Sequence, residues 1–201
     1  MLQSLEIMLK LPNVTLACLR GIKYDNHAHW QALKKSSEEI EFGAILDIQL
    51  AEVTNIDSWN KAVIYELPKY INTSHCMFIH HDGYVIHPEL WNPEWLDLDY
   101  IGAPFPLPQD DFSYRDEEGK LQRVGNSVSL RSKKLIDRVA QFPWQSFHGF
   151  YNEDGFIAVN HRKELEREGF KFGTLEQAAH FSKEHEIPEN KDIIPFAFHS
   201  L

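Results

Sequence analysis

The sequence predicts an α/β fold in which helices flank a mainly parallel central sheet. Three short apolar runs, at 14–21, 42–49 and 75–80, have the length and composition of buried strands. Two segments in which apolar residues recur at helical spacing separate these runs, at 29–42 and 57–67. Because alternating strands and helices are typical of parallel strands joined by helical crossovers, we expect the three strands to share one sheet.

Each of the two predicted helices has one apolar face. In the second helix, Asp57 or Ser58 is expected to cap the N-terminus, and Pro68 marks the end of the helix or a kink. In the first helix, we expect one face to carry Trp30, Leu33, Ser37 and Ile40.

The second half of the chain is less regular. A strand and a Pro-rich turn are expected at 98–106. The segment 106–122 is polar and acidic, and we expect either a mobile lid or an ordinary surface loop there, because few apolar residues could anchor it. No internal repeat or domain boundary is visible, so we interpret residues 1–201 as a single domain. Helices are expected at 132–142, 152–170 and 174–184.

Composition narrows the classes of function. The formal net charge of -10 argues against a nucleic-acid partner. The two cysteines, Cys18 and Cys76, lie in apolar segments and are expected to be buried free thiols. No stretch approaches the ~20 apolar residues of a transmembrane segment, and no targeting segment is visible. We therefore expect a cytoplasmic protein and leave peripheral attachment to a membrane open.

Polar residues interrupt the chain directly after the third predicted strand, at His80, His81 and Asp82. In open α/β sheets, ligands bind at the carboxyl ends of the strands. The oxygens of an aspartate at such a place suit a hard divalent cation, Mg or Mn. An Asp-Gly pair such as Asp82-Gly83 is also a common hairpin signal, and the spacing alone favours neither interpretation.

Four segments of the chain, taken in order, resemble a known family. The family has the GT-A nucleotide-diphospho-sugar transferase fold, has long been catalogued as a domain of unknown function, and is known mainly from bacterial polysaccharide and lipopolysaccharide gene clusters. The resemblance runs from about Val14 to His199 and implies a GT-A-like fold. The segments that carry it are "YINTSHCMFIHHDGYVIHPELWNPEWLDLDYIGAPFP", "RVGNSVSLRSKKLI", "NEDGFIAVNHRKELEREGFKFGTLEQAAHFSKE" and "PFAFH".

The resemblance implies a metal site. Asp82 stands at the last position of the Asp-x-Asp motif of GT-A enzymes, which binds Mn or Mg, and His199 in "FAFH" matches a C-terminal histidine ligand. Phosphate oxygens of the substrate and water would complete the coordination. His80 replaces the glutamine of the family, and whether it touches the ribose, reaches the metal or only packs stays open.

The resemblance also implies a reaction. The implied reaction transfers a sugar from a nucleotide-diphosphate donor to a hydroxyl of a glycan or lipid-linked glycan. A UDP-sugar is the first donor expected, and the configuration of the sugar is expected to be inverted. Asp154 is expected to be the general base, with Glu153 as the alternative. The sequence "GNSVSLRS" lacks the glycine pair of the family and His80 replaces its glutamine, so a catalytically weakened sugar-nucleotide-binding protein stays open. A metal-dependent hydrolase of sugar nucleotides that uses the same Asp and His residues stays open as well. The residues expected to bind substrate are Arg20, Tyr24, His80, His81, Asn126 and Arg131.

Overall fold

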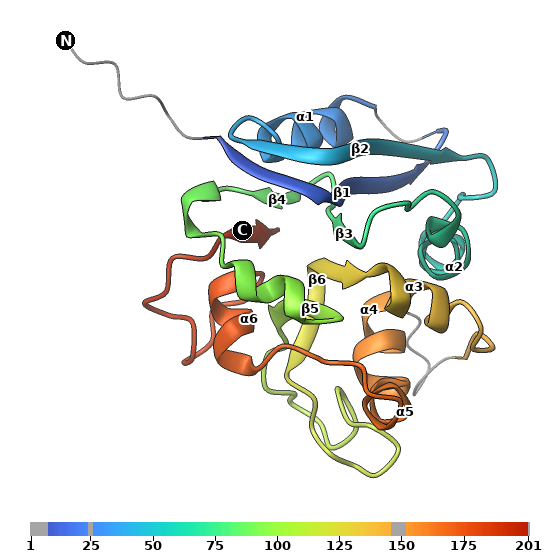
Figure 1. The fold of residues 1–201 in the computed structure, drawn as a ribbon. Coiled ribbons are helices and arrows are strands. Elements are labelled where there is room, and N and C mark those ends of the chain that lie inside the picture. The colour runs from blue at the N-terminus through green and yellow to red at the C-terminus, as the bar shows by residue number, and fades with distance from the viewer. Residues whose placement is uncertain (1–7, 24–25, 146–151, 201) are drawn as a thin grey trace.

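The structure is a computed structural model that describes residues 8–23, 26–145 and 152–200. Within these residues the strands form two sheets, and helices flank them (Figure 1). The strands are β1 (Leu9–Gly21), β2 (Ile40–Leu50), β3 (His75–Phe78), β4 (Gly83–Val85), β5 (Tyr100–Pro104), β6 (Val124–Ser132), β7 (Ser182–Lys183) and β8 (Ala197–His199). The larger sheet has the order β2-β1-β3-β6-β5, and the smaller sheet has the order β4-β8-β7.

The larger sheet is mixed rather than mainly parallel. β1 pairs in parallel with both β2 and β3, as the alternation of strands and helices predicts. β6 runs antiparallel to both β3 and β5. The expectation of a mainly parallel sheet is therefore wrong for the part of the sheet that contains β6 and β5. The reason is that a loop joins β5 to β6, and a loop allows antiparallel neighbours where parallel strands need a crossover.

The first two helices lie where the sequence predicts them, with different ends. α1 ends before Ile40, which already begins β2, and Trp30 is 54% exposed instead of facing the core. The N-cap of α2 is Asn55, whose side chain accepts a hydrogen bond from the Ser58 backbone N–H, and the Ser58 side chain completes the capping box by accepting from the Asn55 backbone N–H. Among the described residues the α-helices are α1 (Asn26–Ser36), α2 (Ile56–Tyr65), α3 (Lys133–Val139), α4 (Glu153–Gly155), α5 (Arg162–Arg167) and α6 (Leu175–Phe181).

The single helix expected at 152–170 is divided into three parts. α4 is one short turn, a π-helical turn follows at Phe156–Asn160, and α5 begins at Arg162. Gly169 has a φ of 91° and stops the segment after α5. Single π-helical turns are frequent at functional sites, and this one directly follows the acidic pair of α4.

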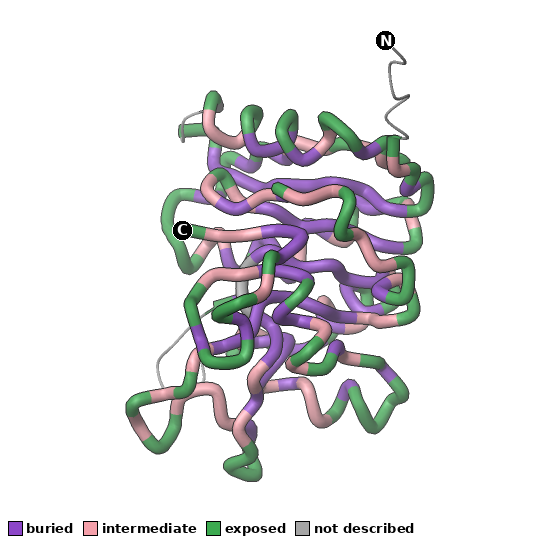
Figure 2. Tube along the Cα trace, turned by 90° about the vertical axis from the view of Figure 1, so that its left-hand side faces the viewer, coloured by how far each residue is buried: buried purple, intermediate pink, exposed green. Residues whose placement is uncertain are grey.

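The core follows the strands. Figure 2 shows buried residues running along the strands through the middle of the molecule and exposed residues along the outer face of α1. All four residues of β3 are buried. Cys18 and Cys76 are free and 0% exposed, which confirms the expectation for both thiols. In the part of the chain described here, no helix is long and apolar enough to cross a membrane.

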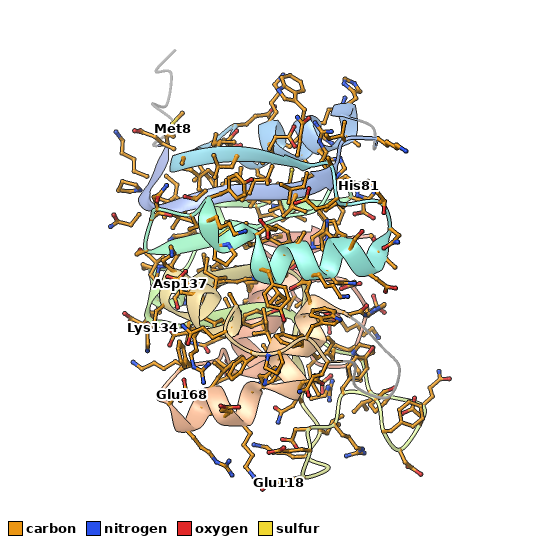
Figure 3. The ribbon with its side chains drawn as sticks, turned by 90° about the vertical axis from the view of Figure 1, so that its right-hand side faces the viewer. Met8, His81, Glu118, Lys134, Asp137 and Glu168 are labelled. Atoms are coloured by element: carbon orange, nitrogen blue, oxygen red, sulfur yellow. The ribbon has the colours of Figure 1, made fainter. Side chains whose placement is uncertain are left out.

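The segment 106–122 is held more firmly than its composition predicts. Asp116 is only 5% exposed, and its carboxylate accepts hydrogen bonds from Gln122 Nε2 and from the Lys120 backbone N–H, each at 2.9 Å. Glu118, at the tip, forms an ion pair with Lys163 of α5. In Figure 3, Glu118 lies at the opposite side of the molecule from α1. These contacts argue against a mobile lid.

Candidate functional site

A pocket of about 530 Å³ lies where β1 and β3 end. The parallel pairing of these strands continues beyond β3, because the Ile79 N–H donates to the Ala17 carbonyl at 2.9 Å. The segments that leave the two strands therefore run side by side. Figure 3 shows His81 at this end of the strands and Met8, which precedes β1, at the other end. The volume lies within the range of about 300–1,000 Å³ that is typical of small-molecule sites.

Most of the predicted site residues line this pocket. The fold brings together residues that are up to 179 positions apart in the sequence, from Arg20 to His199. Tyr24 and the side chain of Asn126 lie outside the described residues. The predicted residues in the pocket wall are Arg20, His80, His81, Asp82, Glu153, Asp154 and His199.

The Asp-Gly pair forms a tight turn and also contributes to the pocket. His80 and Gly83 exchange backbone hydrogen bonds of 2.9 and 3.4 Å across the turn, so the hairpin interpretation holds locally. β4 then leaves β3 and pairs with β8, with Gly83 opposite His199. A Cβ atom on residue 83 would come within 2.7 Å of His199 Cδ2. Glycine therefore allows β8 to bring His199 beside Asp82.

His199 lies between two carboxylates. Its Nε2 atom is 3.1 Å from Asp82 Oδ1, and its Nδ1 atom is 3.3 Å from Glu184 Oε1. Burial alone would lower the pKa of His199, but the hydrogen bonds and charges of Glu184 and Asp82 raise this pKa above its ordinary value. Burial alone would raise the pKa of Asp82, but His199 and a hydrogen bond from Ser200 lower it. Near neutral pH Asp82 is therefore a carboxylate.

The spacing of Asp82 and His199 suits a pair of metal ligands. Two ligands at adjacent corners of an Mg octahedron, each about 2.1 Å from the ion, are about 3 Å apart. The separation of 3.1 Å between Asp82 Oδ1 and His199 Nε2 matches this value. Among the described residues, no group of three or more His, Cys, Asp or Glu side chains could hold a metal ion. The pair therefore fits an ion that takes its other ligands from substrate and water.

His80 is a neutral, mostly enclosed imidazole. Its ring centroid lies 5.3 Å from that of Trp59, 5.6 Å from that of Phe78 and 4.7 Å from that of His199. Burial, together with the positive charges of His199 and Arg131, lowers the pKa of His80 to about 3. Its Nε2 atom is buried and has no hydrogen-bond partner within the described structure. Since buried polar atoms are usually paired, an atom of a bound ligand would satisfy it.

Glu153 and Arg131 form a buried ion pair beside the pocket. Arg131 Nη2 lies 2.8 Å from Glu153 Oε2, and the two side chains are 0% and 3% exposed. Burial raises the pKa of Glu153 to about 7, against the opposing charge of Arg131. Asn60 of α2 also accepts a hydrogen bond of 2.9 Å from the Glu153 backbone N–H. Arg131 therefore acts on the site through Glu153, and the expectation that it touches substrate does not fit its complete burial.

Asp154 is the more accessible member of the acidic pair. Its side chain is half-buried and lines the pocket. Its Oδ1 atom accepts a hydrogen bond of 2.7 Å from the Gly155 backbone N–H. α4 thus presents one carboxylate that is enclosed with Arg131 and one that solutes in the pocket can reach.

Arg20 is fixed at the end of β1. Its guanidinium donates two hydrogen bonds to Asp47 of β2, at 2.9 Å to Oδ1 and 2.8 Å to Oδ2. Burial acts to raise the pKa of Asp47, but these bonds and the charge of Arg20 lower it below its ordinary value. Two-point contact fixes the plane of the guanidinium, so Arg20 has a defined orientation beside the pocket.

The sequence alone did not identify several residues of the pocket wall. Trp59 of α2 donates its indole N–H to the Leu19 carbonyl at 2.7 Å. His29 stacks near His81, with ring centroids 5.1 Å apart. No sequence pattern points to Glu184, because β7 and β8, which bring it beside His199, pair only in the folded chain. The pocket residues that were not predicted include His29, Asn55, Trp59, Asn60 and Glu184.

Comparison with known proteins places this geometry in context. No curated protein matches the sequence. A structure described as a glycosyltransferase involved in the glycosylation of the major capsid of PBCV-1 is similar with a TM-score of 0.52 and 11% identity, over 92% of this chain and 91% of that chain. An active-site mutant of LgtC gives a TM-score of 0.49 and 14% identity, over 92% of this chain and 86% of that chain.

The first likeness shows that the chain has an α/β fold of the kind found in a glycosyltransferase. A family profile matches residues 50–199, which include β3, α4 and β8 and therefore most of the pocket. The chain belongs to this family, which is described as "Protein of unknown function (DUF5672)".

Proposed function

We propose that the chain is a metal-dependent glycosyltransferase that moves a sugar from a nucleotide-diphosphate donor to a hydroxyl acceptor. One observation carries the proposal: Asp82, His199 and Asp154 line a single pocket at the carboxyl ends of β1 and β3. This pocket holds a carboxylate and an imidazole at ligand spacing, together with a separate accessible carboxylate. In glycosyl transfer from a diphosphate, a metal held by the first two groups stabilises the leaving charge, and the third group can take the proton of the acceptor.

Asp82 and His199 would hold a Mn or Mg ion. Such an ion, when bound, neutralises the negative charge that builds on the departing diphosphate. The buried Nε2 atom of His80, which has no hydrogen-bond partner among the described residues, supports a role for this side chain in holding the donor. Arg20 and His81, which also line the pocket, are the further donor contacts that we propose. A UDP-sugar is the donor we propose first.

Asp154 would act as the general base. It accepts the proton of the acceptor hydroxyl as the hydroxyl oxygen attacks the anomeric carbon and the bond from that carbon to the diphosphate breaks. Attack from the face opposite the diphosphate inverts the configuration. Glu153 is enclosed with Arg131 and orients α4 rather than taking the proton. A glycan or lipid-linked glycan is the acceptor class we propose, in surface polysaccharide synthesis.

The experiment is an assay of UDP release from a panel of UDP-sugars, with Mn and with candidate glycan acceptors. We expect release that requires the acceptor and Mn, yields a glycosylated acceptor, and is lost with EDTA and in Asp82→Ala. Asp111→Ala, which removes an exposed carboxylate that does not line the pocket, is the matched control. Release of free sugar at the same rate with and without acceptor would contradict transfer and indicate a hydrolase.

A further inference from the structure

Glu184 has no part in the reaction proposed above, yet the fold places it against His199. β7 and β8 pair in parallel, with Ser182 opposite Ala197 and Lys183 opposite Phe198. The next residues along the two strands are Glu184 and His199, so the register of the sheet makes them neighbours. Both side chains are only 16% exposed. The contact is therefore built into the backbone and does not depend on a flexible surface side chain.

The two carboxylates beside His199 compete for one proton. Glu184 Oε1 faces Nδ1 at 3.3 Å, and Asp82 Oδ1 faces Nε2 at 3.1 Å. A neutral imidazole carries its proton on one nitrogen and offers a lone pair on the other. An ionised carboxylate only accepts, so each carboxylate favours the N–H on its own side of the ring. The tautomer decides whether Nε2, the nitrogen beside Asp82, can bind a cation.

We propose that Glu184 is a positioning residue that keeps the proton of neutral His199 on Nδ1 and so leaves Nε2 for the divalent cation shared with Asp82. This inference rests on the proposed function and deepens it. Histidines that bind metals commonly donate their other N–H to a carboxylate, and loss of such a partner typically costs about 10- to 100-fold in metal affinity.

A direct ligand role for Glu184 is the competing explanation. Glu184 Oε2 is buried and has no hydrogen-bond partner among the described residues. However, no three such side chains in the described structure converge on a common metal position. The other neighbour of Glu184 Oε1, His185 Nε2, is 3.9 Å away on a side chain that is 50% exposed, so it offers little competition for the carboxylate. Conservative and non-conservative variants of Glu184 separate the two roles.

The first measurement is the tautomer of His199, from heteronuclear NMR of the imidazole nitrogens in the metal-free protein at about pH 9, where an imidazole is largely neutral. We expect Nδ1–H in the wild type. In Glu184→Leu we expect Nε2–H, because Asp82 is then the remaining acceptor. Glu184→Gln should keep more of the Nδ1–H form than Glu184→Leu, since its amide oxygen still accepts, although more weakly than a carboxylate. The matched control is Glu186→Leu, because the Glu186 side chain is 66% exposed and pairs with Lys183 at 3.6 Å.

The second measurement is the affinity for Mn in the presence of UDP, from electron paramagnetic resonance titration. Glu184→Leu should bind Mn about 10- to 100-fold more weakly than the wild type. Glu184→Gln should fall between the two, and Glu186→Leu should match the wild type. An unchanged tautomer or unchanged Mn affinity in Glu184→Leu would overturn the proposal. Equal weakening in Glu184→Gln and Glu184→Leu, with the tautomer kept in Glu184→Gln, would overturn it in favour of a direct ligand.

The two measurements also separate this inference from the proposed function. Wild-type protein that binds no Mn with UDP would refute the metal site of the proposed transferase. The tautomer measured without metal would then still decide whether Glu184 determines which ring nitrogen of His199 carries the proton.

Discussion

Gly83 and His199 face each other across the antiparallel pair of β4 and β8, and a side chain on residue 83 would occupy the space of the imidazole. A Cβ atom there would lie 2.7 Å from His199 Cδ2 and 2.9 Å from Val128 Cγ2. We predict that Gly83→Ala displaces His199 from Asp82 and weakens Mn binding with UDP by about 10-fold or more. Calorimetric titration of Mn in the presence of UDP would measure this affinity. Wild-type affinity in a folded Gly83→Ala variant would contradict this account of the site.

Asp154 is the accessible carboxylate of α4, and its replacement tests the proposed base. Asp154→Asn keeps the shape of the side chain and removes its basicity. We expect turnover to fall by about 10²- to 10⁴-fold, with donor affinity little changed. Steady-state kinetics and a separate UDP titration give the two quantities, with Asp111→Asn as the control for loss of one negative charge. Near-normal turnover would move the role of base away from Asp154.

Glu153 is the ion-pair partner of the buried guanidinium of Arg131, at 2.8 Å, and Arg131 Nε also donates a hydrogen bond to Ser129 Oγ at 2.8 Å. We predict that above about pH 7, where the Glu153 carboxyl is ionised, Glu153→Leu lowers the free energy of unfolding by about 3–5 kcal/mol, because it leaves a buried charge uncompensated. Urea denaturation measures the difference, and Glu38→Leu, at an exposed position, is the control. Adding Arg131→Met to Glu153→Leu should recover part of the loss. No recovery would show that Arg131 is not the source of the instability.

The pKa of Glu153 predicts a pH dependence of stability. Burial raises this pKa from 4.5 to about 7, so the folded chain binds the proton more tightly than the unfolded chain. The stabilisation from this proton is complete below pH 4.5 and is lost as the pH rises to about 7. The difference in unfolding free energy between wild type and Glu153→Gln should therefore shift in favour of Glu153→Gln over this interval. A difference that does not change with pH would contradict the raised pKa.

Asp116 organises the segment 106–122 through the backbone N–H groups of Glu118 and Lys120, which donate to its Oδ1 atom at 3.1 and 2.9 Å. We predict that Asp116→Ala speeds hydrogen exchange of these two amides, since their acceptor is removed. In the wild type, Mn and UDP should leave exchange in this segment unchanged, because its tip is tied to α5 through Lys163. If ligand binding instead slows hydrogen exchange in this segment, the segment is the mobile lid that its composition suggests.

The sequence by itself determined the first half of the fold. Strand β1, helix α1, strand β2, helix α2 and strand β3 follow from apolar runs and helical spacing, because each of these patterns is local. It also indicated that Asp82 stands where a strand ends, at the edge where ligands of such sheets bind. The end of α1 was placed too late because Ile40 continues the helical spacing of apolar residues while belonging to the next strand.

Only the tertiary structure decided the rest. The antiparallel direction of β6 depends on pairing with β3 and β5, which no local pattern encodes. The different environments of Glu153 and Asp154 depend on where the Arg131 guanidinium lies, since the two residues are adjacent and chemically alike. Glu184 meets His199 through the register of β7 and β8. In each case the deciding contact joins segments far apart in the chain, and only folding brings their charges and hydrogen-bonding groups within range of one another.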